Sequence, residues 1–231
     1  MDYELVLVDA DDTLFDYRKA VARALPALFA RFGLPWDPDR DPARFRAANT
    51  QVWSEMRAGL ISYADLKIER FRKMLPNESL DFQAVSHTYL SLLVEFAQLI
   101  DGAEEVCRYL ASKYTLAIVT NGLPEIQKPR VRLSSLSRYI PEERVFVAED
   151  VGHRKPDPEI FRHVFRALGH SDKKTAIIIG DSLAEDIQGG VNFGIDTCWF
   201  DRAGLDGPQD VRPTFTVRSL LEIVDILAKP A

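Results

Sequence analysis

Residues 5–13 read LVLVDADDT, an uninterrupted apolar run that ends abruptly in three carboxylates. The apolar part is short and rich in β-branched side chains, which predicts a strand buried on both faces, as in a parallel sheet. Asp9 and Asp11 are two positions apart, so an extended backbone directs both to the same side. Carboxylates clustered at the end of a buried strand cost free energy unless a cation or a proton shares the space. A solvated turn is the alternative interpretation, and later segments must decide between the two.

Four further apolar runs have the same character, and segments of helical periodicity separate them. The predicted strands cover residues 116–119, 145–147, 176–179 and 197–200, and helices are expected around 106–110, over 158–168, from 183, and over 219–228. Strands that alternate with helices predict right-handed βαβ units. The expected fold class is therefore α/β, with a doubly wound, Rossmann-like parallel sheet.

Between the first strand and the rest of this pattern, residues 16–100 show only helical periodicity. Apolar stripes repeat at helical spacing, with breaks at Gly33-Leu34-Pro35, Gly59 and Pro76-Asn77. These stripes predict a small helical bundle inserted directly after the first strand. The expected domains are residues 1–15 with 101–231 as the core, and residues 16–100 as the insertion.

Composition limits the function classes. The 231 residues are 46% hydrophobic and 28% charged with a net charge of −6, and no basic tract is present, which argues against a nucleic acid polymer as partner. No apolar stretch is long enough to span a bilayer, and the N-terminus lacks the basic segment of a signal peptide, so no membrane partner and a cytoplasmic location are expected. Cys107 and Cys198 are predicted to be reduced core thiols. A monomer or a weak homodimer is expected.

Polar side chains follow four of the predicted strands, at the edge where open parallel sheets bind ligands. They are Asp9 and Asp11, Thr120 and Asn121, Lys155, and Asp181 with Asp186. Taken singly, each has an ordinary explanation: Lys155 precedes a helix start, and Asp186 could be a solvated acid in a first helical turn. Their combination at successive strand ends favours one shared site.

Phosphoryl transfer is the chemistry that suits these groups. Asp9 would attack phosphorus, while Asp11 would protonate the leaving oxygen and then take a proton from water. A Mg²⁺ ion would neutralise the phosphoryl charge, held by Asp9, Asp181 and the backbone carbonyl of Asp11. The predicted cofactor is therefore Mg²⁺.

The predicted phosphate-binding groups come from the neighbouring strand ends. The Thr120 hydroxyl and the Lys155 ammonium would hold the phosphate oxygens in line for the attack. Backbone N–H groups after Asp9, from Ala10 on, would complete the cradle, and Asn121 is a further predicted substrate-binding residue.

The chain resembles the haloacid dehalogenase superfamily of phosphohydrolases over essentially its whole length. The motifs are Asp9-Ala10-Asp11-Asp12-Thr13, Thr120-Asn121-Gly122, Lys155-Pro156 and Gly180-Asp181-Ser182-Leu183-Ala184-Glu185-Asp186. The resemblance implies an aspartyl-phosphate on Asp9, a small phosphorylated metabolite as substrate, and a supporting role for Asp186 beside the metal or Lys155. It also implies that the inserted helices form a cap of the C1 type.

One departure from the family pattern concerns the substrate. Most members carry Gly where this chain has Asp12, whereas the branch that looks like bacterial pyrimidine 5′-nucleotidases often carries an acid there. Residues 48–61 and 197–199 also resemble that branch. The resemblance therefore implies hydrolysis of nucleoside 5′-monophosphates.

The inserted helices offer the residues that would read the leaving group. They are Asn49 and Trp53, followed by Tyr17, Arg57 and Tyr63. An aromatic ring could stack on a base and an amide could read its edge. For each residue the ordinary explanation is a place in the bundle's own core or on its solvated surface.

Four alternatives to a nucleotidase stay open at this point. A phosphatase of small sugar phosphates or phosphoglycolate would use the same residues, and so would a phosphomutase. A 2-haloacid dehalogenase also uses an Asp nucleophile but normally lacks the second acid, so Asp11 argues against it. A receiver domain has a different motif order and no helical insertion after its first strand.

Overall fold

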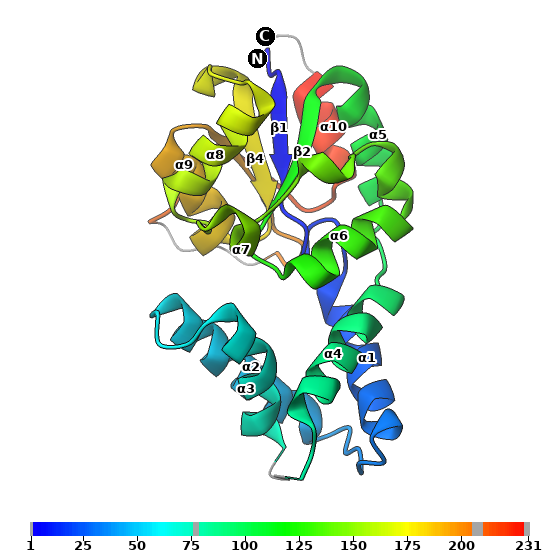
Figure 1. Ribbon diagram of the computed structural model, residues 1–231. Helices are drawn as coiled ribbons and strands as arrows, with labels where there is room; N and C mark the ends of the chain where they lie inside the picture. Colours follow the sequence, from blue (N-terminus) through cyan, green and yellow to red (C-terminus); the bar gives the residue numbers. More distant parts are fainter. Residues whose placement is uncertain (1, 76–78, 205–209, 229–231) are drawn as a thin grey trace. The chain divides into compact units, whose positions relative to one another are not determined.

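The computed structural model describes residues 2–75, 79–204 and 210–228, and these divide into two compact units. One unit comprises Met1–Asp16 with Gln98–Ala231, and the other comprises Tyr17–Ala97. The first contains the sheet and the second contains only helices (Figure 1). The predicted break at Pro76-Asn77 lies outside the described residues.

The sheet unit is built on six parallel strands in the order β3-β2-β1-β4-β5-β6. The strands are β1 (Leu5–Val8), β2 (Thr115–Thr120), β3 (Val145–Val147), β4 (Ala176–Gly180), β5 (Asp196–Phe200) and β6 (Phe215–Val217). β1 lies at the centre, with Val8 opposite Ile118 on one side and opposite Ile179 on the other. Strands β2 and β3 lie on one side of β1, and β4, β5 and β6 lie on the other side. The loop after β1 therefore lies at the topological switch point, where such sheets bind ligands.

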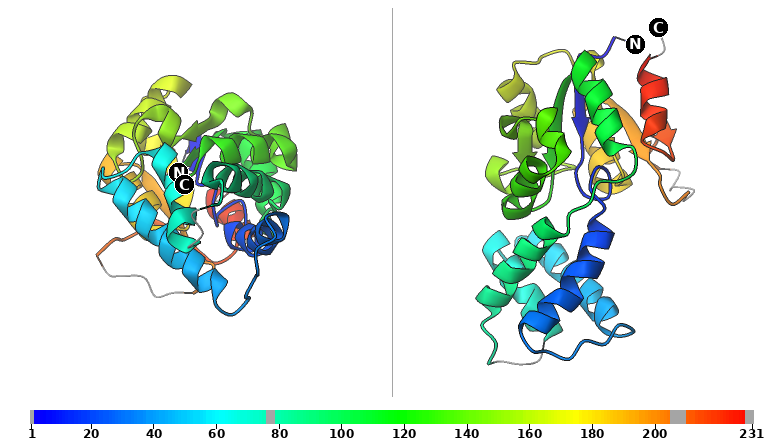
Figure 2. Two further views of the ribbon diagram at one scale, coloured as in Figure 1. Left: turned by 60° about the horizontal axis from the view of Figure 1, so that its bottom comes forward. Right: turned by 90° about the vertical axis from the view of Figure 1, so that its right-hand side faces the viewer.

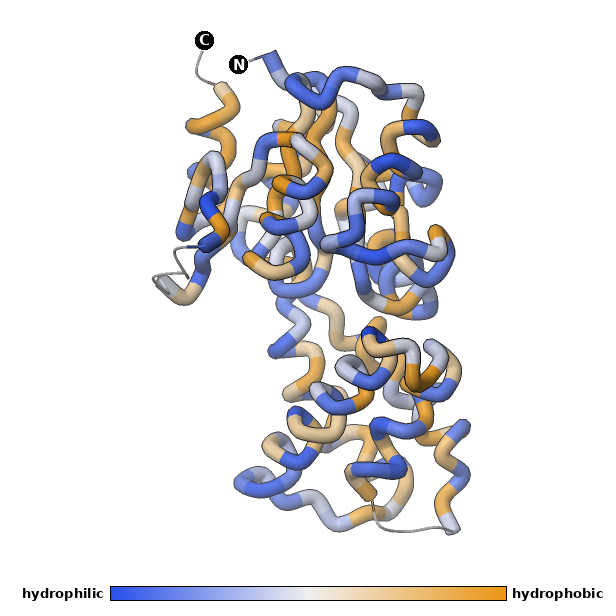
Figure 3. Tube along the Cα trace, turned by 90° about the vertical axis from the view of Figure 1, so that its left-hand side faces the viewer, coloured by the Kyte–Doolittle hydropathy of each residue, from blue (hydrophilic) through white to orange (hydrophobic). Residues whose placement is uncertain are grey.

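Helices cover both faces of this sheet (Figures 1 and 2). One face carries α5 (Ala103–Lys113), α6 (Pro124–Leu133) and α10 (Leu221–Ala228), and the other carries α8 (Pro158–Leu168) and α9 (Gln188–Phe193), with the short α7 (Ala148–Val151) after β3. Leu5 and Leu7 of β1 point to the α8 side, where they pack in one cluster with Phe161 and Phe193. The residues of the central strands β1 and β4 are buried and mostly hydrophobic, and Figure 3 gives the hydropathy of each residue along the chain. The prediction of an α/β doubly wound parallel sheet is confirmed.

The helical unit has its own apolar core. Its helices are α1 (Tyr17–Arg31), α2 (Asp41–Arg57), α3 (Tyr63–Met74) and α4 (Phe82–Glu95). Phe45, Phe71 and Tyr89 come from three of these helices, and their ring centroids are 5.2–6.2 Å apart. Capping explains where two of the helices begin: Ser62 forms a capping box with Asp65, and Asp81 accepts two backbone N–H groups.

Strand β6 and helices α6 and α7 of the sheet unit were not predicted. Strand β6 is only three residues long, and one of its residues is exposed, so it leaves almost no apolar pattern. Helix α6 begins and continues with proline, at Pro124 and Pro129, which in a sequence indicates a loop. The helix predicted from Leu183 is present: it begins with a π-helical turn, Leu183–Ile187, and continues as α9.

The structure also bears on the predictions made for the two cysteines and for membrane-spanning segments. Cys107 and Cys198 are both free and buried, as predicted for core thiols. Among the described residues, every helix is too short or too polar to cross a bilayer.

Candidate active site

Lys155 is the centre of the polar cluster at the carboxyl ends of the strands. Its side chain is 1% exposed, and its Nζ donates to Asp9 Oδ1 at 2.6 Å, to Asp186 Oδ1 at 2.5 Å and to the carbonyl of Val119 at 2.6 Å. Burial works against the charged ammonium, but the carboxylates of Asp186 and Asp9 outweigh it and raise the pKa of Lys155 above its ordinary value. A permanent cation therefore lies between two acids from distant parts of the chain.

The acids around this lysine are more numerous than one cation can neutralise. Burial raises the pKa of Asp9 well above its ordinary value; Lys155 opposes this, whereas Asp186 and Asp181 add to it. Asp9, Asp181 and Asp186 each offer a carboxylate oxygen, and these oxygens all lie within 4.8 Å of one another. Hard carboxylate donors at this spacing fit a divalent cation such as Mg²⁺.

Asp186 reaches this cluster because of the π-helical turn. The N–H of Ile187 donates to the carbonyl of Ser182, five residues back, and the carboxylate of Asp186 accepts from the N–H of Ser182 at 3.0 Å. Asp186 is 1% exposed, so its interpretation as a solvated acid in a first helical turn is wrong. A Cβ at position 180 would collide with this carboxylate, which explains the glycine that ends β4.

Asp181 is held at the edge of the cluster by its backbone. Its N–H donates to Thr13 Oγ1 at 3.1 Å, and its carbonyl accepts from Trp199 Nε1 at 2.9 Å. Burial, followed by the charges of Asp186 and Asp12, raises the pKa of Asp181 to about 7. Lys155 opposes this shift but does not cancel it, so the described residues compensate the Asp181 charge only in part.

This deficit predicts how Mg²⁺ affects stability. In chelator, native Asp181 keeps its proton up to pH about 7, whereas the unfolded chain loses it near its ordinary value, so the stability of the metal-free protein falls as pH rises between them. The loss attributable to this shift is at most about 4 kcal/mol. Thermal unfolding should show Mg²⁺ raising the melting temperature most above pH 7, and much less in D181N. A melting temperature independent of Mg²⁺ would contradict the metal assignment.

The loop that carries Lys155 is fastened by Asn121. The Asn121 side chain donates to the carbonyl of Lys155 and accepts from its N–H, both at 2.9 Å, and also donates to Glu185 Oε2 at 2.9 Å. Its amide is thus occupied by protein groups, so any contact of Asn121 with substrate would come from its backbone N–H. The neighbouring Thr120 is 1% exposed, and its hydroxyl accepts a hydrogen bond from the N–H of Gly122 at 3.1 Å.

The turn after β1 has an uncommon backbone conformation at position 12. Asp12 has φ +57°, a left-handed conformation that favours Gly and that Asp tolerates better than most residues. Its N–H donates to the carbonyl of Phe15 at 2.7 Å, and the N–H groups of Leu14 and Phe15 return to the carbonyl of Ala10. This tight turn sets the direction of the Asp11 side chain.

Two residues that the sequence did not single out contact Asp11. Gln127 and Arg130 lie on α6, and both are buried. Gln127 Nε2 donates to Asp11 Oδ2 at 2.7 Å, and Arg130 Nη1 lies 2.7 Å from Asp11 Oδ1. The signal that could have revealed them is their three-residue spacing, which places both on one face of a helix that the prolines concealed.

Two of the candidate substrate-reading residues in the helical unit, Trp53 and Tyr63, contact each other. Trp53 on α2 and Tyr63 at the start of α3 have ring centroids 6.4 Å apart in an edge-on arrangement, and Arg57 is exposed. Asn49 has a buried Oδ1 that accepts no hydrogen bond from the described residues. Their predicted role in reading the leaving group stays a prediction.

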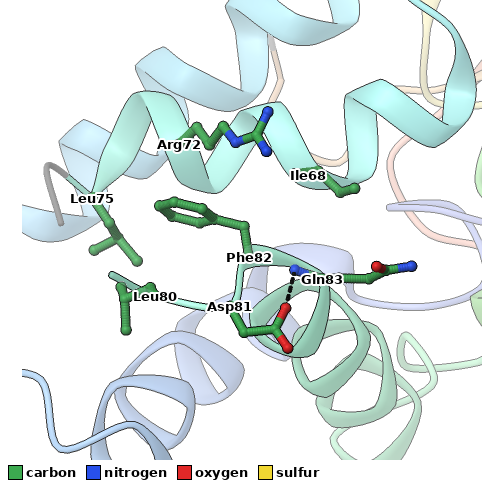
Figure 4. Close-up of a pocket in the computed structure, with 7 residues that line it drawn as sticks. All are labelled: Ile68, Arg72, Leu75, Leu80, Asp81, Phe82 and Gln83. Carbon is green, nitrogen blue, oxygen red and sulfur yellow. Dashed lines mark hydrogen bonds between the residues drawn. The ribbon is translucent and has the colours of Figure 1, made fainter. Parts of the chain in front are cut away.

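A cavity of about 690 Å³ also lies in the helical unit, between α3 and the start of α4 (Figure 4). It is lined by Ile68, Arg72, Leu75, Leu80, Asp81, Phe82 and Gln83. Its two charged side chains already have partners: Arg72 pairs with Glu69, and Asp81 caps α4. The lining residues include none of the acids described above, so this cavity does not contribute to the candidate active site.

Comparisons with known proteins identify the family of this chain. The family model for haloacid dehalogenase-like hydrolases matches residues 3–194. The HAD-hydrolase YfnB of Bacillus subtilis (strain 168) is 34% identical over 97% of this chain and 95% of its own length. Its magnesium-bound crystal structure matches with a TM-score of 0.88 at 33% identity, covering 99% of this chain and 100% of that one.

Two relatives that match over nearly their whole length carry the name pyrimidine 5′-nucleotidase. Pyrimidine 5′-nucleotidase PynA of Streptococcus pneumoniae (strain ATCC BAA-255 / R6) is 30% identical over 99% of this chain and 97% of its own. Pyrimidine 5′-nucleotidase YjjG of Escherichia coli (strain K12) is 26% identical over 99% of this chain and 100% of its own. The resemblance stated from the motifs is confirmed, and the chain is an enzyme of the haloacid dehalogenase-like hydrolase family.

Proposed function

We propose that the enzyme is a Mg²⁺-dependent phosphomonoester hydrolase that forms an aspartyl-phosphate on Asp9 and acts on nucleoside 5′-monophosphates. The observation that carries the proposal is the buried Lys155 ammonium, 2.6 Å from Asp9 and 2.5 Å from Asp186, beside a third acid at Asp181. The pyrimidine 5′-nucleotidases among its full-length relatives support the substrate class.

In the first step a carboxylate oxygen of Asp9 attacks phosphorus, and the bond from phosphorus to the ester oxygen breaks. Asp11 donates a proton to the departing oxygen, so the nucleoside leaves as a neutral alcohol. The ammonium of Lys155 and the hydroxyl of Thr120 hold the phosphoryl oxygens, and a bound Mg²⁺ would supply further positive charge there through Asp9, Asp181 and the carbonyl of Asp11.

In the second step water attacks phosphorus of the aspartyl-phosphate while the Asp11 carboxylate accepts its proton. The bond from phosphorus to the Asp9 oxygen breaks, which releases inorganic phosphate and restores the Asp9 carboxylate. Asp186 contacts the Lys155 ammonium, which supports a positioning role for it.

Phosphate release from a substrate panel tests this function. The panel contains pyrimidine and purine nucleoside monophosphates, small sugar phosphates and phosphoglycolate, each assayed with Mg²⁺ and with chelator. We expect Mg²⁺-dependent release, with kcat/KM for the best nucleotide roughly 10-fold or more above that for the sugar phosphates, because contacts to the base add binding energy.

The outcomes separate the alternatives. Equal kcat/KM across the panel would overturn the nucleotidase assignment and keep the phosphatase. Phosphate that appears on a second sugar instead of in solution would indicate a phosphomutase. Halide release from a 2-haloacid without any phosphate release would indicate a dehalogenase.

A further inference from the structure

We propose that Gln127 and Arg130 of α6 act as a two-residue clamp that positions the Asp11 carboxyl group for proton transfer. The proposal rests on the proposed function, in which Asp11 is the general acid and base. Gln127 and Arg130 are positioning residues: each touches Asp11 and would act on the reaction through it.

The three side chains form a closed set of contacts. Gln127 Nε2 donates to Asp11 Oδ2 at 2.7 Å, Arg130 Nη1 lies 2.7 Å from Asp11 Oδ1, and Arg130 Nη2 donates to Gln127 Oε1 at 2.5 Å. Each carboxylate oxygen therefore faces its own donor. Two contacts at fixed positions restrict rotation of the carboxyl group far more than one contact would.

The surroundings hold the clamp itself in place. The Arg130 guanidinium carbon lies 4.3 Å from the ring centroid of Phe15, which is 1% exposed and belongs to the same turn as Asp11. A Cβ at position 122 would collide with the Gln127 amide, so Gly122 of the Thr-Asn-Gly motif leaves room for that side chain. The clamp thus depends on two of the motifs that build the candidate site.

Burying the polar side chains of Gln127 and Arg130 costs free energy, which their contacts with Asp11 would explain. Gln127 is 1% exposed and Arg130 is 3% exposed, whereas the Asp11 side chain is 31% exposed. Arg130 Nε is buried and donates to no acceptor among the described residues. A buried guanidinium with an unused donor is poor support for stability, since apolar side chains of similar size do as well or better in such places.

The contacts suit the base role of Asp11. Asp11 Oδ1 is buried beside Arg130 and accepts no aligned hydrogen bond from the described residues. After the proton has left, the Arg130 charge and the Gln127 amide both face the carboxylate. The group is then held ready to accept a proton from water.

Leaving-group dependence separates positioning of an acid from general damage. A nucleoside alkoxide needs a proton to depart, whereas p-nitrophenolate departs without one. In Q127L and R130M we expect kcat/KM for a nucleoside monophosphate to fall roughly 10- to 100-fold, and kcat/KM for p-nitrophenyl phosphate to fall less than about 3-fold. D11N should show the same selectivity in larger degree, and R130K should recover part of the loss.

R132M is the matched control. Arg132 lies on the same helix, but its side chain is 63% exposed, and its ion pair with Glu142 is a surface contact of 3.8 Å. For R132M, kcat/KM for both substrates should stay within about 2-fold of the wild-type value. Melting temperatures of all variants show which remain folded, and Q127L with R130K decides the question if R130M does not fold.

Equal losses on the two substrates, or no loss on either, would overturn the clamp while leaving the phosphatase intact. Absence of Mg²⁺-dependent phosphate release from the wild type would instead overturn the proposed function. The two failures are therefore distinguishable in one set of assays.

Discussion

Replacement of Asp9 by Asn should abolish phosphate release, by at least about 10⁴-fold, because an amide cannot attack phosphorus. The fold should survive. Asn has the size of Asp, and Lys155 keeps its ion pair with Asp186, so the ammonium is not left without a charged partner. Steady-state release of phosphate and thermal unfolding measure the two effects. Acid quenching followed by mass spectrometry should find a phosphoryl group on the peptide containing Asp9 in the wild type alone.

Asp12→Asn is the control for this variant. Asp12 lies in the same turn, and Asn also tolerates its φ of +57°. Its effect on kcat/KM should stay within about 10-fold, since it removes a nearby charge but no nucleophile. Wild-type turnover by D9N, or a phosphoryl group on another residue, would refute the covalent assignment.

Replacement of Lys155 by Met should be the most destabilising single change in the site. Its Nζ is the buried partner of Asp9 and Asp186, and removing one member of a buried charged pair typically costs about 3–5 kcal/mol. Turnover should also fall by roughly 10³-fold or more, because the phosphoryl oxygens lose a fixed cation. Urea unfolding in chelator measures the stability, and phosphate release measures the turnover.

A double-mutant cycle shows whether the cost arises from uncompensated charge. Addition of D186N to K155M removes one of the stranded carboxylates, so the double variant should be more stable than K155M alone. Lys128→Met is the matched control, since Lys128 pairs with Asp150 at 2.5 Å with both side chains at least one-third exposed, and should cost less than about 1 kcal/mol. A K155M protein as stable as K128M would contradict the electrostatic account.

Short-range patterns were enough to predict most of the sheet. The runs at 116–119, 145–147, 176–179 and 197–200 lie within β2, β3, β4 and β5. A strand buried on both faces needs continuous apolar residues, and that requirement is visible in the sequence. Strand β6 and helix α6 escaped prediction because their stability comes from neighbours rather than from their own periodicity or propensity.

The sequence by itself determined which chemical groups follow each strand, because every motif is local and parallel strands end at one edge. Only the tertiary structure decided which of these groups touch. Lys155 meets Asp9 across 146 positions of sequence, and Gln127 meets Asp11 across 116. Such pairs depend on loop paths, on the π-helical turn that turns Asp186 inward and on the packing of α6. These features arise from contacts throughout the sheet unit, so no local pattern of residues encodes them.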